Sequence, residues 1–381
     1  MSVFRFLSIQ EPIKEGNVQV SGTLLEQPKI YDKWQYFDMD GYRVKAPSTL
    51  EVDYGDKLEI VGRVQNERLV AADLKAIGES KWQKGLFSIR EKLKEKIFAA
   101  LPEPQAALLA GIVLGVKQDL PADFGESLRK TGTIHVVVVS GYNISVVAGF
   151  TIGLVRFVRR QIAIILALLA IIFYTLLVGA EPPAVRAAIM GVVGFTAIFL
   201  GRQRYALYSL FLAAFLMIFV NPKVVGEIGF QLSFLATAGI ILFQERIYKF
   251  LKFLPGPFSD DLATTLAAQS LVVPIIFYHF GSVSAISPVV NAAVLWTIPL
   301  ATILGFLFLA TSFIVPILAA GIGSVIWGVL SIFVFLVELF GKLSFAYLHF
   351  TPKELLPVVI YYVFLLVVII YLKNVRLVKP K

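Results

Sequence analysis

The chain has 381 residues, of which 57% are hydrophobic, and its mean hydropathy is +0.77. This composition excludes an ordinary soluble domain and indicates a polytopic α-helical membrane protein. The net charge is +9, cysteine is absent and there are three histidines, so we expect no disulfide, no metal site and no cofactor.

Residues 1–80 are predicted to form a small all-β, OB-like domain. The Asp-Gly pair in "WQYFDMDGYRVKA" separates two aromatic-rich runs, which indicates a hairpin. A second hairpin is expected around Asn66-Glu67, between "DKLEIVGRV" and "RLVAADLKAI". About five short strands favour a small barrel. The segment has 10 Lys and Arg against 13 Asp and Glu, so the basic excess belongs to the rest of the chain.

Residues 81–101 change to a helical period. Apolar side chains recur every three or four residues and form one stripe, which consists of Trp82, Leu86, Ile89, Leu93 and Ile97. The opposite face is rich in lysine. Such a helix is typical of the membrane interface, where it contacts lipids. The alternative is that the stripe packs on the β domain.

Residues 102–381 are predicted to form a transmembrane domain with about nine spans. The short segment 104–116 is interrupted by glycine, which indicates a re-entrant turn. The candidate spans are 134–157, 161–179, 183–201, 205–220, 228–244, 262–280, 287–311, 314–340 and 355–372. Several are shorter than the roughly 20 residues that a straight crossing needs.

The positive charges between spans predict the orientation. If nine spans alternate, four clusters fall on one side: Arg156, Arg159 and Arg160; Arg202 and Arg204; Arg246, Lys249 and Lys252; Lys373, Arg376, Lys379 and Lys381. By the positive-inside rule this side is cytoplasmic, so the C-terminus is inside and the β domain outside. Because an acidic domain needs a signal for export, we expect further spans upstream of this sequence.

Polar side chains at membrane depth indicate pathways or sites, because burying them unpaired in hydrocarbon is costly. They occur beside prolines and glycines, which suggests broken helices around a wet interior. A structural reading stays open for each: hydrogen bonds between helices, a Glu181–Arg186 pair, or an interfacial position for His279. The candidates are His135, Ser140, Gly141, Asn143, Glu181, Arg186, Gln231, Ser233, Gln269 and Asn291.

Four ordered blocks in residues 105–305 resemble the ComEC family of competence proteins. They are "LLAGIVLGVKQDLPADFGESLRKTGTIHVVVVSGYNISVVAG", "LVGAEPPAVRAAIMG", "GFQLSFLATAGI" and "SLVVPIIFYHFGSVSAISPVVNAAVLWTIPL". The resemblance implies a DNA internalisation channel that moves single-stranded DNA across the bacterial cytoplasmic membrane during natural transformation. It points to His135, Ser140, Gly141, Arg186, Gln231, Ser233, Gln269 and Asn291.

Two departures from the family limit this resemblance. Asn143 stands where the family often has a second histidine, which argues against a two-histidine metal site. The C-terminal metallo-β-lactamase-like domain of many members is also missing from this sequence, so the chain resembles a short form. The family further implies a DNA-receptor protein outside, a cytoplasmic helicase-like ATPase and a separate nuclease as partners.

We therefore expect a passive conduit for single-stranded DNA, and not an enzyme. Arg186 is the expected phosphate contact, and neutral polar residues line the path. In the β domain, Trp34, Tyr36, Phe37 and Tyr42 offer stacking surfaces for bases, although net acidity equally favours a docking or structural role. The alternatives are an intramembrane hydrolase or nuclease, with Glu181 as general base, and a small-molecule transporter.

Overall fold

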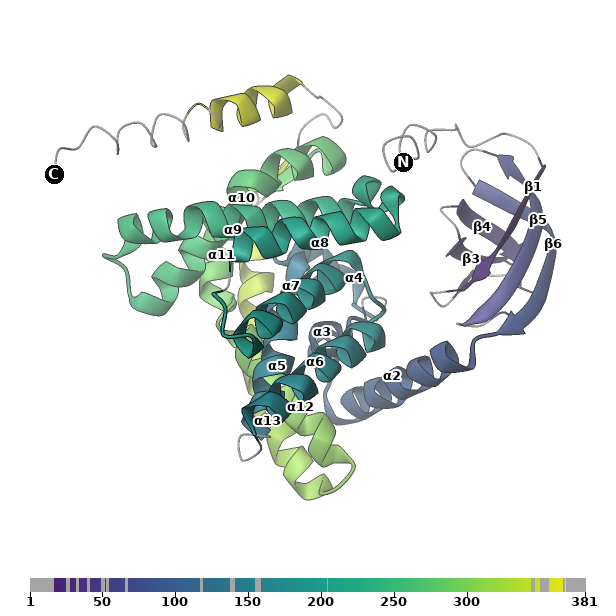
Figure 1. The fold of residues 1–381 in the computed structure, drawn as a ribbon, viewed down its shortest axis with the longest axis horizontal. Coiled ribbons are helices and arrows are strands. Elements are labelled where there is room, and N and C mark those ends of the chain that lie inside the picture. Colours follow the sequence, from purple (N-terminus) through teal and green to yellow (C-terminus); the bar gives the residue numbers. More distant parts are fainter. Residues whose placement is uncertain are drawn as a thin grey trace. The chain divides into compact units, whose positions relative to one another are not determined.

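The fold is taken from a computed structural model (Figure 1). It describes residues 17–24, 28–31, 34–39, 42–48, 52, 55–65, 68–116, 119–137, 141–154, 159–203, 205–343, 347–349, 356–365 and 367. The chain forms two compact units, Met1–Glu95 and Lys96–Lys381, each with its own core. Helix α2 (Lys81–Ala100) contains the boundary between them.

The first unit is a six-stranded sheet. Its strands are β1 (Asn17–Thr23), β2 (Lys29–Tyr31), β3 (Trp34–Met39), β4 (Tyr42–Pro47), β5 (Asp56–Gln65) and β6 (Arg68–Glu79). They are ordered β1-β5-β6-β4-β3-β2, and only β4 and β6 pair in parallel. Strand β1, at one end of the sheet, also contacts β3, the second strand from the other end, so the sheet curls toward a barrel. This is the arrangement of the partly open Greek-key barrel that the sequence predicted.

Both predicted hairpins form. Met39 pairs with Tyr42 at the first turn, and Gln65 pairs with Arg68 at the second. Alternate residues of the strands point inward, and Val44, Leu58, Ile60 and Leu69 form the centre of the core together with the other members of the cluster. The acidic and basic residues stay outside this core.

Helix α2 starts from the end of β6 and is held to the sheet by charge. Lys84 lies 2.8 Å from Asp56 and 2.7 Å from Glu79, and hydrogen bonds to these two carboxylates raise the pKa of its ammonium group. Along the predicted apolar stripe, Leu86 and Ile97 are buried, whereas Trp82 is 65% exposed. The stripe is therefore covered by protein over only part of its length, and an interfacial role for it stays a prediction.

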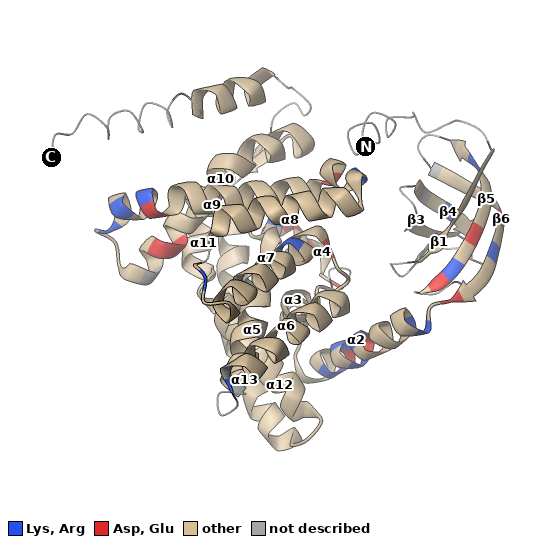
Figure 2. Cartoon of the chain, viewed as in Figure 1, with Lys and Arg blue, Asp and Glu red and all other residues tan. Residues whose placement is uncertain are grey.

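The second unit consists mainly of apolar helices. Their bounds are α3 Gln105–Leu114, α4 Ala122–Lys130, η1 Ile134–Val136, α5 Gly141–Leu154, α6 Arg160–Leu177, α7 Pro182–Phe199, α8 Ala206–Val220, η2 Pro222–Gly226, α9 Ile228–Leu251, α10 Gly256–Phe280, α11 Ser287–Val294, α12 Thr297–Ser312 and α13 Pro316–Gly341. A last described helix covers Leu356–Leu365. Figure 2 shows these helices largely free of charged residues, unlike α2.

The short helix α3 forms the centre of this unit. All ten of its residues are buried, and it contacts α12 and α13. Three hydrogen bonds join α3 to other helices: the Asn143 amide donates to the Ile112 carbonyl, the Tyr174 hydroxyl donates to the Val113 carbonyl, and Gln105 of α3 donates to the Ser331 hydroxyl of α13. The segment predicted as re-entrant is thus a buried helix of ten residues, too short to cross a membrane by itself.

Helices α9 and α10 form an antiparallel pair that packs closely at Gly239. A Cβ atom added to Gly239 would lie 2.3 Å from the Ala267 carbonyl oxygen, so only glycine permits this approach. Pro274 lies inside α10, and the described helix continues past it to Phe280. Strand β7 (Ser282–Ser284) then pairs with β8 (Tyr347–His349).

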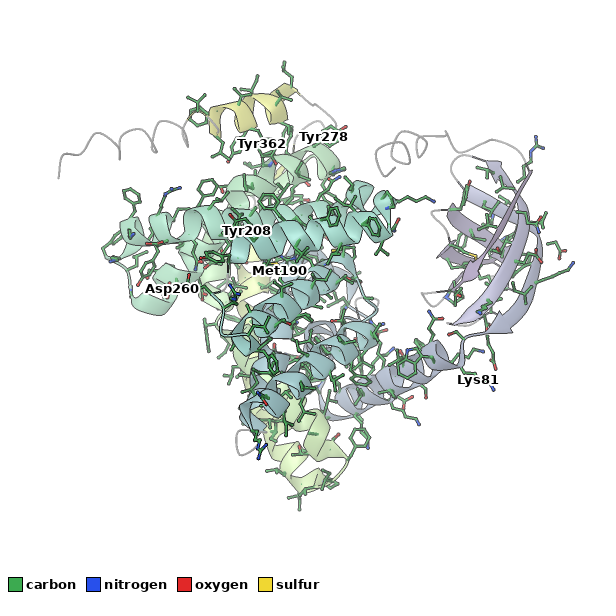
Figure 3. The ribbon with its side chains drawn as sticks, in the orientation of Figure 1. Lys81, Met190, Tyr208, Asp260, Tyr278 and Tyr362 are labelled. Carbon is green, nitrogen blue, oxygen red and sulfur yellow. The ribbon has the colours of Figure 1, made fainter. Side chains whose placement is uncertain are left out.

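Four of the described helices are long and apolar enough to cross a membrane, and a fifth span forms if the bent pair α11–α12, with its 43° bend, is counted as one. The other predicted spans coincide with apolar helices of 10–17 residues. Helix α8 exposes Tyr208, labelled in Figure 3, and Phe211, Phe215 and Phe219. Large exposed apolar faces of this kind are suited to lipid. The count of nine spans stays a prediction.

Candidate functional site

The polar residues singled out in the sequence fall into separate groups, and the first surrounds Arg186. This side chain, on the second turn of α7, is 8% exposed. Its Nη1 donates to the Ser233 carbonyl on α9 at 3.2 Å. Its Nη2 faces Gly141, the first residue of α5, where an added Cβ would lie 3.3 Å from that nitrogen. Gly141, Arg186 and Ser233 therefore meet at one point from three helices.

Two buried polar atoms in this group, Arg186 Nε and Ser233 Oγ, have no hydrogen-bond partner among the described residues. The described part of the chain offers no salt bridge to Arg186. Glu181 precedes α7 as its N-cap residue, but its side chain does not cap the helix. The Glu181–Arg186 pair that the sequence left open is thus not formed.

The second group surrounds Ser287, at the start of α11. The Ser287 hydroxyl accepts hydrogen bonds from Gln269 on α10, at 2.8 Å, and from Asn291, at 3.2 Å. Gly132 packs against it, because a Cβ added there would lie 2.6 Å from Ser287 Oγ. Asn291 Oδ1 and Ser284 Oγ are buried without a partner among the described residues. This group lies where the chain passes from α10 to the broken pair α11–α12.

His135 joins the second group through the backbone. Its Nδ1 lies 3.0 Å from the Gly132 carbonyl, so Nδ1 carries the proton in the neutral ring and Nε2 is left as an acceptor. The side chain is exposed. Ser140 lies outside the described residues, so the pairing of His135 with Ser140 in the hydrolase alternative has no described geometry.

Gln231 forms a third group, near the start of α9. Its Nε2 donates to the Val225 carbonyl at 2.9 Å, and its Oε1 lies 3.2 Å from His279 Nε2 on α10. His279 therefore binds a neighbouring helix as well as lying near the end of its own. Gln231 and Ser233, close in sequence, take part in different groups, as expected for residues two apart on a helix.

Asn143 differs from the other candidates, because it is fully buried and its amide nitrogen donates to the Ile112 carbonyl of α3. Its Oδ1 has no partner in the described part of the chain. Sequence reasoning also missed Ser287 and Tyr174, which bind between helices. The Ser287-Pro288 break was a usable signal for Ser287, whereas Tyr174 lies in an ordinary apolar run.

The four aromatic residues of the β unit occupy different environments. Trp34 is 37% exposed, and Lys45 Nζ lies 4.1 Å from the centre of its ring. Tyr36 and Tyr42 are half-buried, and Tyr42 packs against the core. Side chains of β3 alternate between the two faces of the sheet, and Phe37 lies on the inward face. It is a core residue and offers no exposed ring face to a base. Its prediction as a stacking residue is therefore wrong.

The described residues contain no group of three or more His, Asp or Glu side chains that could hold a metal ion. The arrangement instead provides neutral hydrogen-bonding groups and one buried guanidinium between apolar helices. It defines a multi-pass helical membrane protein with polar contacts inside its membrane unit and a small OB-like β unit. The model of the Competence protein family matches residues 112–375, and the chain belongs to this family.

Three curated relatives are similar to parts of the chain. ComE operon protein 3 of Bacillus subtilis is 27% identical over 54% of this chain and 26% of its own length. An uncharacterized protein of Aquifex aeolicus is 31% identical over 69% of this chain and 62% of its own. The uncharacterized protein YcaI of Escherichia coli is 31% identical over 22% and 12%. The chain thus spans less than two thirds of each relative, and no solved structure matches it.

Proposed function

We propose that the membrane unit is a passive conduit for single-stranded DNA across the bacterial cytoplasmic membrane during natural transformation. Membership of the Competence protein family and similarity to ComE operon protein 3 support a role in DNA uptake. The observation that carries the conduit is the polar group of Gln269, Ser287 and Asn291 at the break between α10 and α11. Irregular backbone at membrane depth is tolerated where protein buries it or where it borders water.

The chemistry of the polar groups suits a polyanion in transit. An apolar pore would exclude a charged strand, and a densely basic one would hold it. Amides, hydroxyls and one arginine lower the barrier through many weak contacts. In the described structure Gln231 and Gln269 are hydrogen-bonded to neighbouring helices, and Asn291 is hydrogen-bonded to Ser287 within α11, so opening of the path requires these bonds to exchange for bonds to DNA or water.

The proposal extends to orientation and partners. The β unit lies outside and the C-terminus in the cytoplasm, as the basic clusters indicate. Exposed Trp34, with Lys45 above it, is suited to stacking on a base beside a phosphate. A receptor protein delivers the strand, a cytoplasmic helicase-like ATPase pulls it, and a separate nuclease removes the other strand.

Photo-crosslinking of the purified full chain tests the conduit. A photoreactive amino acid replaces Gln231 or Gln269, and a labelled oligo(dT) is added to the protein in detergent. Matched controls replace Phe211 or Phe219, which α8 exposes on its outer face. We expect crosslinks at the first two positions and none at the controls. Equal crosslinking at all four positions, or none at Gln231 and Gln269, contradicts a path through the interior.

The same preparation separates the alternative functions. If the labelled oligo(dT) is shortened, and the shortening persists after contaminating nucleases have been removed from the protein, the result would support a hydrolase. Uptake of a small solute into proteoliposomes, with no crosslinks to DNA, would support a transporter. Either result would replace the conduit, because the conduit predicts intact DNA that contacts the polar positions.

A further inference from the structure

Arg186 lies at a place where the backbone is already electropositive. It belongs to the second turn of α7, and its Nη2 faces Gly141, the first described residue of α5. The N-terminus of a helix carries a partial positive charge and disfavours a nearby cation. The guanidinium thus lies beside the first described residue of α5, where a cation is unfavourable unless an anion compensates it.

Some hydrogen-bond donors beside Gly141 have no acceptor within the described protein. Arg186 is more than nine-tenths buried, and within the described part of the chain its one hydrogen bond runs from Nη1 to the Ser233 carbonyl. Its Nε and the Ser233 hydroxyl are buried with no partner among the described residues. Buried hydrogen-bond donors of native proteins nearly always have an acceptor, so unpaired donors indicate a missing acceptor such as a bound anion.

No described carboxylate compensates the guanidinium. Glu181, the nearest acidic residue in sequence, forms no salt bridge with it, and the described salt bridges all lie elsewhere. An acidic partner would neutralise the site, whereas free donors and a positive field accept a negatively charged oxygen. Arginine and serine donors at a helix N-terminus are the usual ligands of phosphate.

We propose that Arg186, Ser233 and the N-terminus of α5 bind one phosphate-class anion. The chemistry suits a phosphodiester, which lipid headgroups and DNA share. We assign the site to a DNA phosphate, and that assignment rests on the proposed conduit. Gly141 keeps the site open: an added Cβ would lie 3.3 Å from Arg186 Nη2 and 3.4 Å from the Ala187 Cβ, in the space beside the guanidinium.

Thermal unfolding of the purified full chain in a phosphate-free detergent tests the site. Dimethyl phosphate, the minimal phosphodiester, is titrated at constant ionic strength against chloride. Bound ligand raises the unfolding midpoint of the wild type. Loss of one charged hydrogen-bond donor weakens binding about tenfold, so Arg186→Gln needs about ten times more dimethyl phosphate for the same shift. Arg246→Gln, at a half-buried arginine of α9 that bonds within its own helix, is the matched control.

Ser233→Ala keeps the test decisive if Arg186→Gln does not fold. Because Ser233 Oγ has no partner among the residues that the structure describes, its removal should leave the ligand-free midpoint unchanged or higher, while the affinity for dimethyl phosphate falls several-fold. A purely structural serine would not separate these two readouts. Gly141→Ala should also weaken binding. If wild type, Arg186→Gln and Ser233→Ala respond equally, the site is overturned.

Two further probes identify the source of the phosphate. Oligo(dT) should bind through Arg186 more tightly than short-chain phosphatidylglycerol does, with the same variants weakened. The reverse order would leave an anion site for a lipid and overturn its assignment to DNA. The conduit can fail separately, because crosslinking at Gln231 and Gln269 does not depend on the response to dimethyl phosphate.

Discussion

The Tyr361 hydroxyl donates to the Ser270 carbonyl at 3.0 Å, and this carbonyl is the one that Pro274 deprives of its helical partner. Proline has no N–H, so the residue four positions earlier loses its hydrogen bond. The last described helix thereby satisfies the break inside α10. Its neighbour Tyr362, labelled in Figure 3, donates to the next carbonyl, that of Leu271, at 2.7 Å.

Replacement of Tyr361 by phenylalanine should lower the stability of the membrane unit. The Ser270 carbonyl would lose its donor, at a cost of about 1 kcal/mol. Denaturation of the purified chain measures the loss. In a Pro274→Ala background, the restored N–H should make Tyr361→Phe nearly neutral. An equal loss in both backgrounds would show that the carbonyl is not the reason.

Gly239→Ala should separate α9 from α10. The new Cβ would lie 2.3 Å from the Ala267 carbonyl oxygen, so the helices must move apart, at a cost of about 1–3 kcal/mol. Gly321→Ala on α13 is the matched control, because, apart from the adjacent residues and the nearby backbone of its own helix, no described atom lies within 4 Å of its added Cβ. It should be neutral or stabilising, since alanine favours helix. Thermal midpoints in detergent compare the two, and similar losses would contradict the close approach.

Ser287→Ala should destabilise the group at the broken helices. The Gln269 and Asn291 amides both donate to the Ser287 hydroxyl, and its loss leaves two donors without an acceptor, which costs about 1–3 kcal/mol. Ser324→Ala provides the control, since Ser324 is exposed and bonds only within α13. The midpoint of Ser287→Ala should fall well below that of Ser324→Ala, and no difference would indicate that the amides find other partners.

The stability of the β unit should depend on alkaline pH through Lys84. Asp56 and Glu79 hold the pKa of this lysine above its ordinary value of 10.5. A raised folded-state pKa stabilises the fold below the unfolded-state pKa, and this contribution disappears as pH rises through the folded-state value.

The difference in urea unfolding between wild type and Lys84→Met should thus be constant from neutral pH to about pH 10 and shrink above it. It should also decrease with added salt, since the lysine is partly exposed. Lys75→Met, at a more exposed pair with Asp73, is the control. A difference that grows above pH 10 would have the wrong sign.

Local patterns predicted the elements of the fold well. Two turns between alternating runs gave the hairpins β3–β4 and β5–β6, because strand period and turn residues act over a few positions. The change to a helical period at residue 81 likewise predicted α2. The apolar runs matched helices, but their lengths did not reveal which cross the membrane, and the short run 104–116 was a buried central helix.

The sequence identified most residues of the candidate site, but it did not identify the partners that they contact. Arg186, Gln269 and Asn291 were recognisable, since polar side chains in apolar runs need a reason. Their partners were not: Ser233 offers Arg186 a backbone carbonyl, which every residue possesses, and His279 reaches Gln231 across 48 positions. Phe37 was misjudged, because an aromatic residue in a strand looks the same in sequence whether it faces the core or solvent.

By itself the sequence determined that this protein is a multi-pass membrane protein with a small β unit, and it indicated the Competence protein family. Composition and periodicity suffice for that, because hydrophobic burial and hydrogen bonding of the backbone act locally. Only the tertiary structure decided that Arg186 meets Gly141 and Ser233, and that Tyr361 supplies the bond lost at Pro274. Such contacts depend on how whole helices pack, and no short stretch of sequence records that packing.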